Sequence, residues 1–242
     1  MRLDRLLAML GEGTRAGVRD MVRAGRVTVD GVAARDAGMR LDAERSRVCV
    51  DGRALCYQRV RHVMLNKPAG VLTAARDPKQ RTVMELLPPL YGAMGCMPAG
   101  RLDKDTEGLL ILTSDGQLAH RLISPRHDVG KLYFARVDGA LDEEDVRAFA
   151  EGLHIDDADG AFAARPARLE IVSSSPEMSE ARVRVTEGKY HQVKRMFAAR
   201  GVQVTNLKRL AIGALALDPS LSPGEWRELT EDEVQLLERD AD

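Results

Sequence analysis

The residues best suited to chemistry lie in a polar loop, GRLDKDTEG, at positions 100–108. It carries the carboxylates of Asp103, Asp105 and Glu107, and carboxylates serve as nucleophiles, general bases or metal ligands. The loop begins like an EF-hand calcium loop, but counting from Asp103 puts Ser114 where a bidentate Glu is required, which rejects calcium. A glycosidase pair is disfavoured, because carboxylates two residues apart rarely span the required distance of about 5–9 Å. On the loop alone, a solvated turn remains the alternative.

A second group of polar side chains lies in EGKYHQVKRMF, residues 187–197. Apolar residues at positions i, i+3 and i+4 of this segment predict a helix that ends before Gly201. We expect the opposite helix face to carry three basic side chains: His191, Lys194 and Arg195. Alone, such a face is more often simply solvated, but together with the carboxylate loop it indicates a site.

Lys131 and Tyr133 are predicted to share one face of an alternating strand, KLYFARV, at residues 131–137. A phenol ring offers a flat apolar surface with a polar tip. A tyrosine packed in the core of a sheet is the alternative interpretation.

The elements that must position these groups mix irregularly along the chain. The pattern predicts a buried strand at Leu109–Leu112, a short helix through 118–122 and a helix around 143–151. Strands are expected near 165–172 and 181–186. Because strands outnumber helices, the pattern indicates an α+β fold with a mixed, mostly antiparallel sheet rather than a doubly wound parallel one.

The first sixty residues have a different character. Apolar positions at helical spacing predict one helix before Gly11 and a second, capped by Thr14, that ends before Gly25. Two strand–turn–strand patterns follow, VTVDGVAA and VCVDGRAL, each with an Asp-Gly turn. One face of the second helix is expected to present a row of four guanidinium groups: Arg15, Arg19, Arg23 and Arg26.

Composition and charge narrow the class of protein. Of 242 residues, 44% are hydrophobic and 30% charged, which excludes a disordered or collagen-like chain. The net charge of −1 hides segregation, because residues 1–60 hold 12 Arg against 8 acids and residues 187–209 hold 6 Lys or Arg against 1 acid. The last 18 residues hold 8 acids against 2 Arg. Such basic segments can bind a polyanion despite the overall balance.

Several other classes are disfavoured. No apolar run approaches the roughly 18 residues that cross a bilayer, and Asp4 makes the N-terminus a poor signal peptide. Three cysteines without CxxC spacing fit a reducing cytosol, so we expect a cytoplasmic protein. The five histidines and three cysteines show no metal-ligand spacing, and no glycine-rich phosphate loop is present. We therefore expect neither a metal nor a cofactor.

Two resemblances join these observations. The order of two short helices and VTVDG resembles the S4 RNA-binding domain. The segments LNKPAG, GRLDKDTEGLLILTSDG, SPRHDVGKLY and EGKYHQVKRMF resemble, in the same order, the RsuA family of ribosomal RNA pseudouridine synthases. The resemblance covers nearly the whole chain. It implies a small S4-like α/β domain and a larger synthase domain that isomerises a uridine in folded RNA without cofactor or metal.

The resemblance also suggests domain limits. We expect an S4-like domain at 1–55, a linker at 56–60, a catalytic domain at 61–235 and an acidic tail at 236–242. An acidic, turn-rich segment at 153–163 is expected to form an exposed hairpin, and no function is assigned to it.

By the same resemblance, Asp103 is the catalytic carboxylate, Tyr133 is the active-site tyrosine, and Lys194 is the cation that keeps Asp103 ionised. The carboxylate can attack C1′ of the ribose or take a proton from C2′, and the sequence leaves both routes open. The expected RNA-binding residues are the four arginines of the N-terminal row together with Arg101, Lys131, His191 and Arg195. Arg101 can fill the gap left by the extruded base or pair with a phosphate.

The identity of the RNA rests on fewer residues. Tyr190-His191 resembles the branch that modifies small-subunit (16S) RNA, so the expected partner is 16S ribosomal RNA or a small-subunit assembly intermediate, bound by a monomer. The alternatives are a large-subunit (23S) synthase and an S4-type RNA-binding protein without catalysis. A hydrolase that releases free uracil is a third possibility.

Overall fold

The computed structural model describes residues 1–239, and the chain divides into two compact units. The first consists of residues 1–61 and 87–96, and the second of residues 62–86 and 97 onward. No helix within residues 1–239 is both long and apolar enough to cross a membrane.

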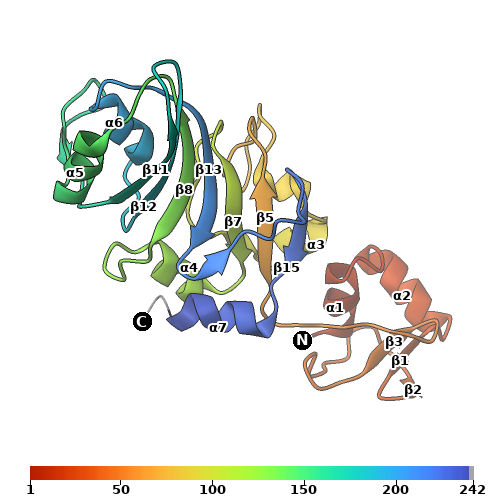
Figure 1. Ribbon diagram of the computed structural model, residues 1–242. Helices are drawn as coiled ribbons and strands as arrows, with labels where there is room; N and C mark the ends of the chain where they lie inside the picture. Colours follow the sequence, from red (N-terminus) through yellow and green to blue (C-terminus); the bar gives the residue numbers. More distant parts are fainter. Residues whose placement is uncertain (240–242) are drawn as a thin grey trace. The chain divides into compact units, whose positions relative to one another are not determined.

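The first unit contains short helices and a four-stranded antiparallel sheet with the strand order β2-β1-β3-β4 (Figure 1). Its elements are α1 (Leu3–Met9), α2 (Arg15–Arg23), β1 (Val27–Val29), β2 (Val32–Ala33), β3 (Val48–Val50), β4 (Arg53–Ala54) and α3 (Pro89–Ala93). Local sequence explains this arrangement. The Thr14 hydroxyl accepts a hydrogen bond from the Gly17 amide at 3.2 Å and caps α2. Both Asp-Gly turns have positive φ at both residues, as tight hairpins require.

This unit has its own apolar core. The buried sides of α1 and α2 pack against alternate residues of β1 and β3. The buried members of that core are Leu3, Leu6, Leu7, Val18, Val22, Val27, Val29, Ala34, Ala37, Val48 and Val50.

Three members of the predicted arginine row lie on α2, and their contact with RNA stays a prediction. Arg15, Arg19 and Arg23 lie exposed on α2. The prediction for Arg26 was wrong, because α2 ends at Arg23 and the chain turns into β1. The Arg26 guanidinium is instead held by both carboxylate oxygens of Asp51, at 2.9 and 2.5 Å.

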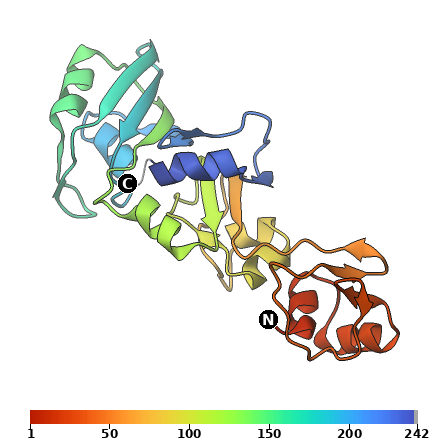
Figure 2. The ribbon, with the colours of Figure 1, turned by 90° about the horizontal axis from the view of Figure 1, so that it is seen from below.

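The second unit is built on a nine-stranded sheet (Figures 1 and 2). The strand order is β11-β12-β8-β13-β7-β5-β15, with β14 beside β13 and β6 beside β7. Only the β13–β7 pair is parallel, which confirms the predicted mixed, mostly antiparallel α+β fold. Its strands are β5 (His62–Lys67), β6 (Met97–Pro98), β7 (Glu107–Thr113), β8 (Lys131–Val137), β11 (Arg168–Ser174), β12 (Ser179–Val185), β13 (Val204–Ile212), β14 (Leu215–Ala216) and β15 (Trp226–Glu228).

Helices flank this sheet. They are η1 (Val83–Leu86), α4 (Gly116–Ile123), α5 (Glu143–Glu151), α6 (Gln192–Ala198) and α7 (Glu231–Arg239). Figure 2 shows α4 and α7 beside each other, and they share an apolar cluster with β7 that includes Leu118, Ile111 and Leu237. Helices α5 and α6 contact each other through Phe149 and Phe197, whose ring centroids lie 5.0 Å apart.

The segment predicted as an acidic tail overlaps α7. Leu237 is fully buried, so residues 236–239 belong to a packed helix rather than to a free tail. Residues 240–242 of that predicted tail lie outside the described part of the chain. The predicted hairpin at 153–163 contains a short antiparallel pair, β9 (His154–Ile155) and β10 (Phe162–Ala163).

Candidate active site

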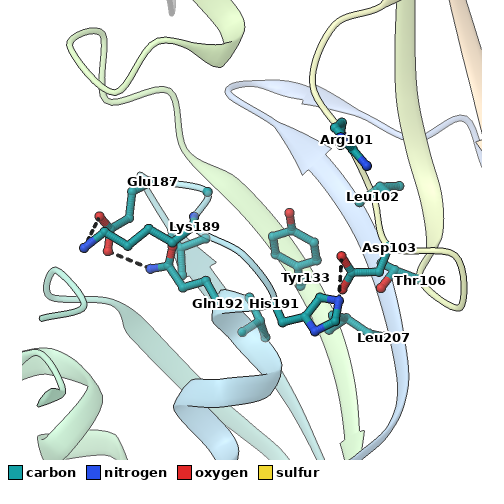
Figure 3. Close-up of a pocket in the computed structure, with 13 residues that line it drawn as sticks. Arg101, Leu102, Asp103, Thr106, Tyr133, Glu187, Lys189, His191, Gln192 and Leu207 are labelled. Carbon is teal, nitrogen blue, oxygen red and sulfur yellow. Dashed lines mark hydrogen bonds and ion pairs between the residues drawn. The ribbon is translucent and has the colours of Figure 1, made fainter. Parts of the chain in front are cut away.

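A pocket in the second unit brings together residues from four separate segments (Figure 3). Its cavity measures about 70 Å³, and Arg101, Asp103, Tyr133, Glu187 and His191 are among its lining residues. A wider groove of about 610 Å³ shares Arg101 and Asp103 with it and continues along the loop that contains Tyr190. The carboxylate loop therefore lies where a small pocket meets a wider groove.

A buried lysine fixes the backbone of the carboxylate loop. Lys67 at the end of β5 is fully buried, and its Nζ donates to the carbonyls of Pro68, Lys104 and Thr106 at 3.0, 3.1 and 2.8 Å. Burial, opposed by nearby carboxylates such as Asp105, lowers the pKa of Lys67 to about 8. This ammonium ties both ends of the turn that follows Asp103, so the turn cannot move independently of the sheet.

The glycine that ends the loop permits a close strand contact. Gly108 has φ +97°, and a Cβ there would lie 2.2 Å from the carbonyl oxygen of Arg209 on β13. No side chain fits at this distance, so only glycine lets β7 begin in parallel against β13. This pairing sets Asp103, five residues earlier, over the face of β13 and its neighbour β8.

Lys194 lies between two carboxylates of the loop. Its Nζ is 3.2 Å from Oδ2 of Asp103 and donates to Oδ1 of Asp105 at 2.6 Å. The two carboxylates differ in setting, because the Asp103 side chain is 29% exposed and the Asp105 side chain is 73% exposed. Asp103 faces the pocket, whereas Asp105 completes the ion pair from the solvent side.

The shifts in pKa agree with this arrangement. Burial opposes the charge of Lys194, but its hydrogen bond to Asp105 and the charge of Asp103 outweigh burial and raise its pKa. Burial of Asp105 likewise favours the neutral acid, but the hydrogen bond and charge of Lys194 prevail and lower its pKa. The lysine is therefore charged throughout the neutral pH range.

His191 closes the pocket from the side of α6. It precedes the first helical residue with φ +49°, a left-handed conformation that turns its ring towards the carboxylate loop (Figure 3). Its Nε2 is 3.5 Å from Oδ1 of Asp103. The exposed ring of Tyr190 stacks on the imidazole with centroids 3.8 Å apart.

The loop before α6 is held by a buried polar network. Gln192 donates from Nε2 to Oε1 of Glu187 at 2.7 Å, and its Oε1 accepts from the Lys189 amide at 3.0 Å. Glu187 also accepts from the Arg165 amide at 2.9 Å. These bonds fix the loop between Glu187 and His191, and with it the imidazole.

Tyr133 forms part of the floor of the pocket. It lies on β8 directly opposite Arg209 of β13, and the Arg209 Nη1 donates to the tyrosine Oη at 3.5 Å. The tyrosine is 9% exposed and lies in the lining of the pocket.

The structure brings Asp103, Tyr133, Lys194, His191 and Arg101 together around this pocket. Lys131 also lies close, in the lining of an adjoining cavity.

The prediction for Arg195 was wrong. Its side chain is buried, donates to Oδ1 and Oδ2 of Asp157 at 2.7 and 2.8 Å, and lies over the ring of Phe162. Helix geometry turns neighbouring residues by about 100°, so Arg195 points away from Lys194 and into the hairpin at 153–163. That hairpin anchors α6 through Arg195.

Sequence reasoning assigned no role to Lys67 and Arg209. The sequence does offer a signal for Lys67, because it ends an apolar strand. A lysine is rarely buried unless its ammonium has partners, so this position predicts a lysine that binds nearby groups. Arg209 gives no comparable local signal, since its place follows from the pairing of β13 with β8. Within residues 1–239, no cluster of three or more His, Cys, Asp or Glu side chains is arranged to hold a metal ion.

Comparison with known proteins agrees with this architecture. The RNA pseudouridylate synthase family model matches residues 61–199, and the S4 domain model matches residues 1–48. An S4 domain followed by a pseudouridylate synthase domain defines an enzyme that modifies RNA by isomerisation.

Individual relatives cover almost the whole chain. An RNA pseudouridine synthase of Bacillus subtilis, described as uncharacterized, is 46% identical over 237 residues, 98% of each chain. Ribosomal small subunit pseudouridine synthase A of Escherichia coli is 40% identical over 235 residues, 97% of this chain and 98% of that one. A crystal structure of a pseudouridylate synthase has a TM-score of 0.67 at 33% identity and covers 98% of this chain and 99% of that one. The chain belongs to the RNA pseudouridylate synthase family and, within it, to the RsuA type.

Proposed function

We propose that this enzyme isomerises one uridine of 16S ribosomal RNA to pseudouridine, with uridine 516 as the candidate position. The single observation that supports the chemistry best is the placement of the Asp103 carboxylate 3.2 Å from Lys194, within the pocket that Tyr133 lines. Similarity to small-subunit synthases supports the choice of RNA. We propose that the enzyme acts in the cytoplasm as a monomer, on 16S RNA or on a small-subunit assembly intermediate.

The reaction explains the proposed roles. Uracil leaves C1′, rotates and rejoins through C5, which then loses its proton while N1 gains one, so the enzyme breaks a glycosidic bond and retains the free base. Asp103 acts on the ribose, either by attack at C1′ or by removal of a proton from C2′, and both routes require an ionised carboxylate. Lys194 stabilises that ion, and Tyr133 provides the surface on which the base lies. Arg101, at the mouth of the pocket, contacts the RNA strand from which the uridine is extruded.

Replacement of Tyr133 by Phe separates stacking from hydroxyl chemistry. The ring remains but the Oη contact with Arg209 is lost. We expect turnover to fall by about 10²-fold or more, as for other lost polar groups at reacting centres, while RNA affinity changes by less than about threefold. Single-turnover rates and filter binding measure the two quantities separately. An equal loss in both would make Tyr133 a binding residue only.

We expect the exposed arginines of α2 to bind phosphates of the RNA for the S4-like domain. In the full chain, replacement of Arg15, Arg19 and Arg23 by Gln should make the slope of log affinity against log salt shallower by about 2–3, since each phosphate contact contributes about 0.7–0.9. Arg26→Gln is the matched control, because Asp51 already holds that guanidinium, and it should leave the slope nearly unchanged. A slope unaffected by the triple change would mean that α2 does not contact the RNA.

Target selectivity tests the proposed substrate. The purified enzyme is incubated with separate 16S and 23S transcripts and with 16S RNA in partly assembled subunits, and pseudouridines are mapped at single-nucleotide resolution. We expect one modified position, in 16S RNA. Modification of 23S RNA alone would reject the proposed substrate while leaving the class of enzyme intact.

A further inference from the structure

A second cavity, of about 90 Å³, adjoins the Asp103 pocket and shares Arg101, Tyr133 and Gly188 with it. Its lining contains three cationic side chains, Arg101, Lys131 and Arg209, and no carboxylate. The Asp103 pocket, by contrast, contains two carboxylates, Asp103 and Glu187, beside two cations, Arg101 and Lys189, so its charges balance while the second cavity has an excess of positive charge.

Arg209 is the most deeply placed of these cations, with 2% of its surface exposed. Its Nε donates to the carbonyl of Leu109 at 2.8 Å and its Nη1 to Tyr133 at 3.5 Å. Its buried Nη2 has no hydrogen-bond partner among residues 1–239. Because a buried polar nitrogen without an acceptor is costly, this nitrogen indicates a ligand that supplies the missing acceptor.

Lys131 is half-buried in the wall of the same cavity. Its Nζ donates to the carbonyl of Val129 at 2.9 Å, which uses one of the three ammonium donors. Burial and the charge of Arg209, opposed by Asp128, lower the pKa of Lys131 to about 8. Asp128 is itself paired with Arg165 and does not neutralise the lysine. The two cations therefore repel each other, and an anion between them would relieve that repulsion.

Strand register places these groups together. On the paired strands β8 and β13, Tyr133 lies opposite Arg209, and Lys131 lies opposite Ile212. Lys131 and Tyr133 are two residues apart on one strand and therefore point to the same face. The cavity is thus a fixed feature of the sheet, next to the tyrosine on which the base is proposed to lie.

We propose that Arg209, Lys131 and Arg101 bind a phosphodiester group of the RNA strand next to the uridine whose base enters the Asp103 pocket. This inference rests on the proposed function and adds a subsite to it. A uracil ring is neutral and gives no reason for three cations, whereas a phosphodiester carries a negative charge and oxygen acceptors suited to a guanidinium. A phosphate held beside Tyr133 fixes the strand while the base is out of its stack.

The test uses a five-nucleotide RNA with one central uridine flanked by cytidines. Four versions each carry a neutral methylphosphonate at a different linkage, and affinities are measured for the wild type and for Lys131→Gln. Arg147→Gln, on the exposed face of α5, is the control for loss of one charge. Arg209→Lys keeps the positive charge but removes the planar guanidinium with its paired N–H donors. A thermal melt verifies that this variant folds. Lys131→Gln carries the test by itself if Arg209→Lys does not fold.

We expect one neutral linkage to weaken binding to the wild type by about tenfold, as loss of a charged hydrogen bond does. Lys131→Gln should weaken binding to the unmodified RNA similarly and abolish the effect of that linkage, because both changes remove the same interaction. The control should retain the full effect. Three results would overturn the proposal. The first is that every neutral linkage weakens binding by the same factor in Lys131→Gln as in the wild type. The others are an unchanged affinity of Lys131→Gln for the unmodified RNA and failure of the oligomer to bind.

Pseudouridine formation by the wild type in 16S RNA is measured in parallel. If pseudouridine forms but the effects of the neutral linkage and of Lys131→Gln on affinity are independent, the phosphate subsite alone is contradicted. If the two effects on affinity are coupled but no pseudouridine forms, the proposed reaction is contradicted and the subsite remains.

Discussion

Asp103→Asn is expected to abolish pseudouridine formation, with a loss of at least about 10⁴-fold, comparable to removal of an essential catalytic group elsewhere. The amide preserves the shape of the side chain but can neither attack C1′ nor remove a proton from C2′. Because the change is isosteric and the side chain is partly exposed, the melting temperature and RNA affinity should change little. Single-turnover rates with 16S RNA, read as pseudouridine content, measure the effect.

The chain supplies a matched control two residues away. Asp105 also pairs with Lys194, but its side chain is 73% exposed and it does not line the pocket. Asp105→Asn should keep the rate within about tenfold, since its interaction is that of a solvent-exposed ion pair. Loss of activity in Asp105→Asn with retention in Asp103→Asn would reverse the assignment.

Lys194→Met is expected to lower the single-turnover rate by about 10²–10³-fold, as removal of a preorganised charge does at other active sites. RNA affinity should change much less, because the lysine faces Asp103 and Asp105 rather than the groove. Lys194→Arg retains the charge and should keep more of the rate than Lys194→Met.

The pH dependence follows from the signs of the shifts. The pKa of Asp105 is lowered, so its part of the ion pair is present above its ordinary value and is lost as pH falls through the lowered one. The pKa of Lys194 is raised, so its part persists below the ordinary lysine value and is lost as pH rises through the raised one. The ion pair should therefore persist between about pH 5 and pH 9, and the wild-type rate should show no change from its loss within that range.

Arg195→Met serves as the control for Lys194. It removes the neighbouring cation of the same helix, which pairs with Asp157 of the hairpin at 153–163. We expect a lower melting temperature, because a buried ion pair loses one partner, but a rate within about tenfold for the folded protein. Equal rate losses in the two variants would show that Lys194 acts through the stability of α6 and not through Asp103.

Local patterns predicted the parts of the fold that depend on neighbouring residues. The apolar run of β7, the alternation of β8 and the threonine cap of α2 are visible within a few residues each. The carboxylate loop was found for the same reason, since its polar residues and glycines are contiguous. The segments carrying Tyr133 and Lys194 were found separately, and the family resemblance connected them.

The features that sequence reasoning missed depend on long-range pairing. Residues 204–212 were not predicted as a strand, yet β13 lies between β8 and β7 and carries Arg209 into the site. Arg195 was misplaced because a hairpin about 35 residues earlier supplies its partners. Arg26 was misplaced because it follows the end of α2 and because its partner, Asp51, lies 25 residues later in the chain. In each case the deciding contact joins residues far apart in the chain.

The most direct test of the account is a product analysis of 16S RNA labelled in its uridines and incubated with the purified wild-type enzyme. Digestion to nucleosides and mass spectrometry distinguish pseudouridine, unchanged uridine and free uracil. The account predicts pseudouridine at one position, no released uracil, and no product with Asp103→Asn. Release of free uracil, or an RNA that is bound but left unchanged by the wild type, would contradict the proposal that Asp103 breaks and the enzyme remakes the bond between ribose and base.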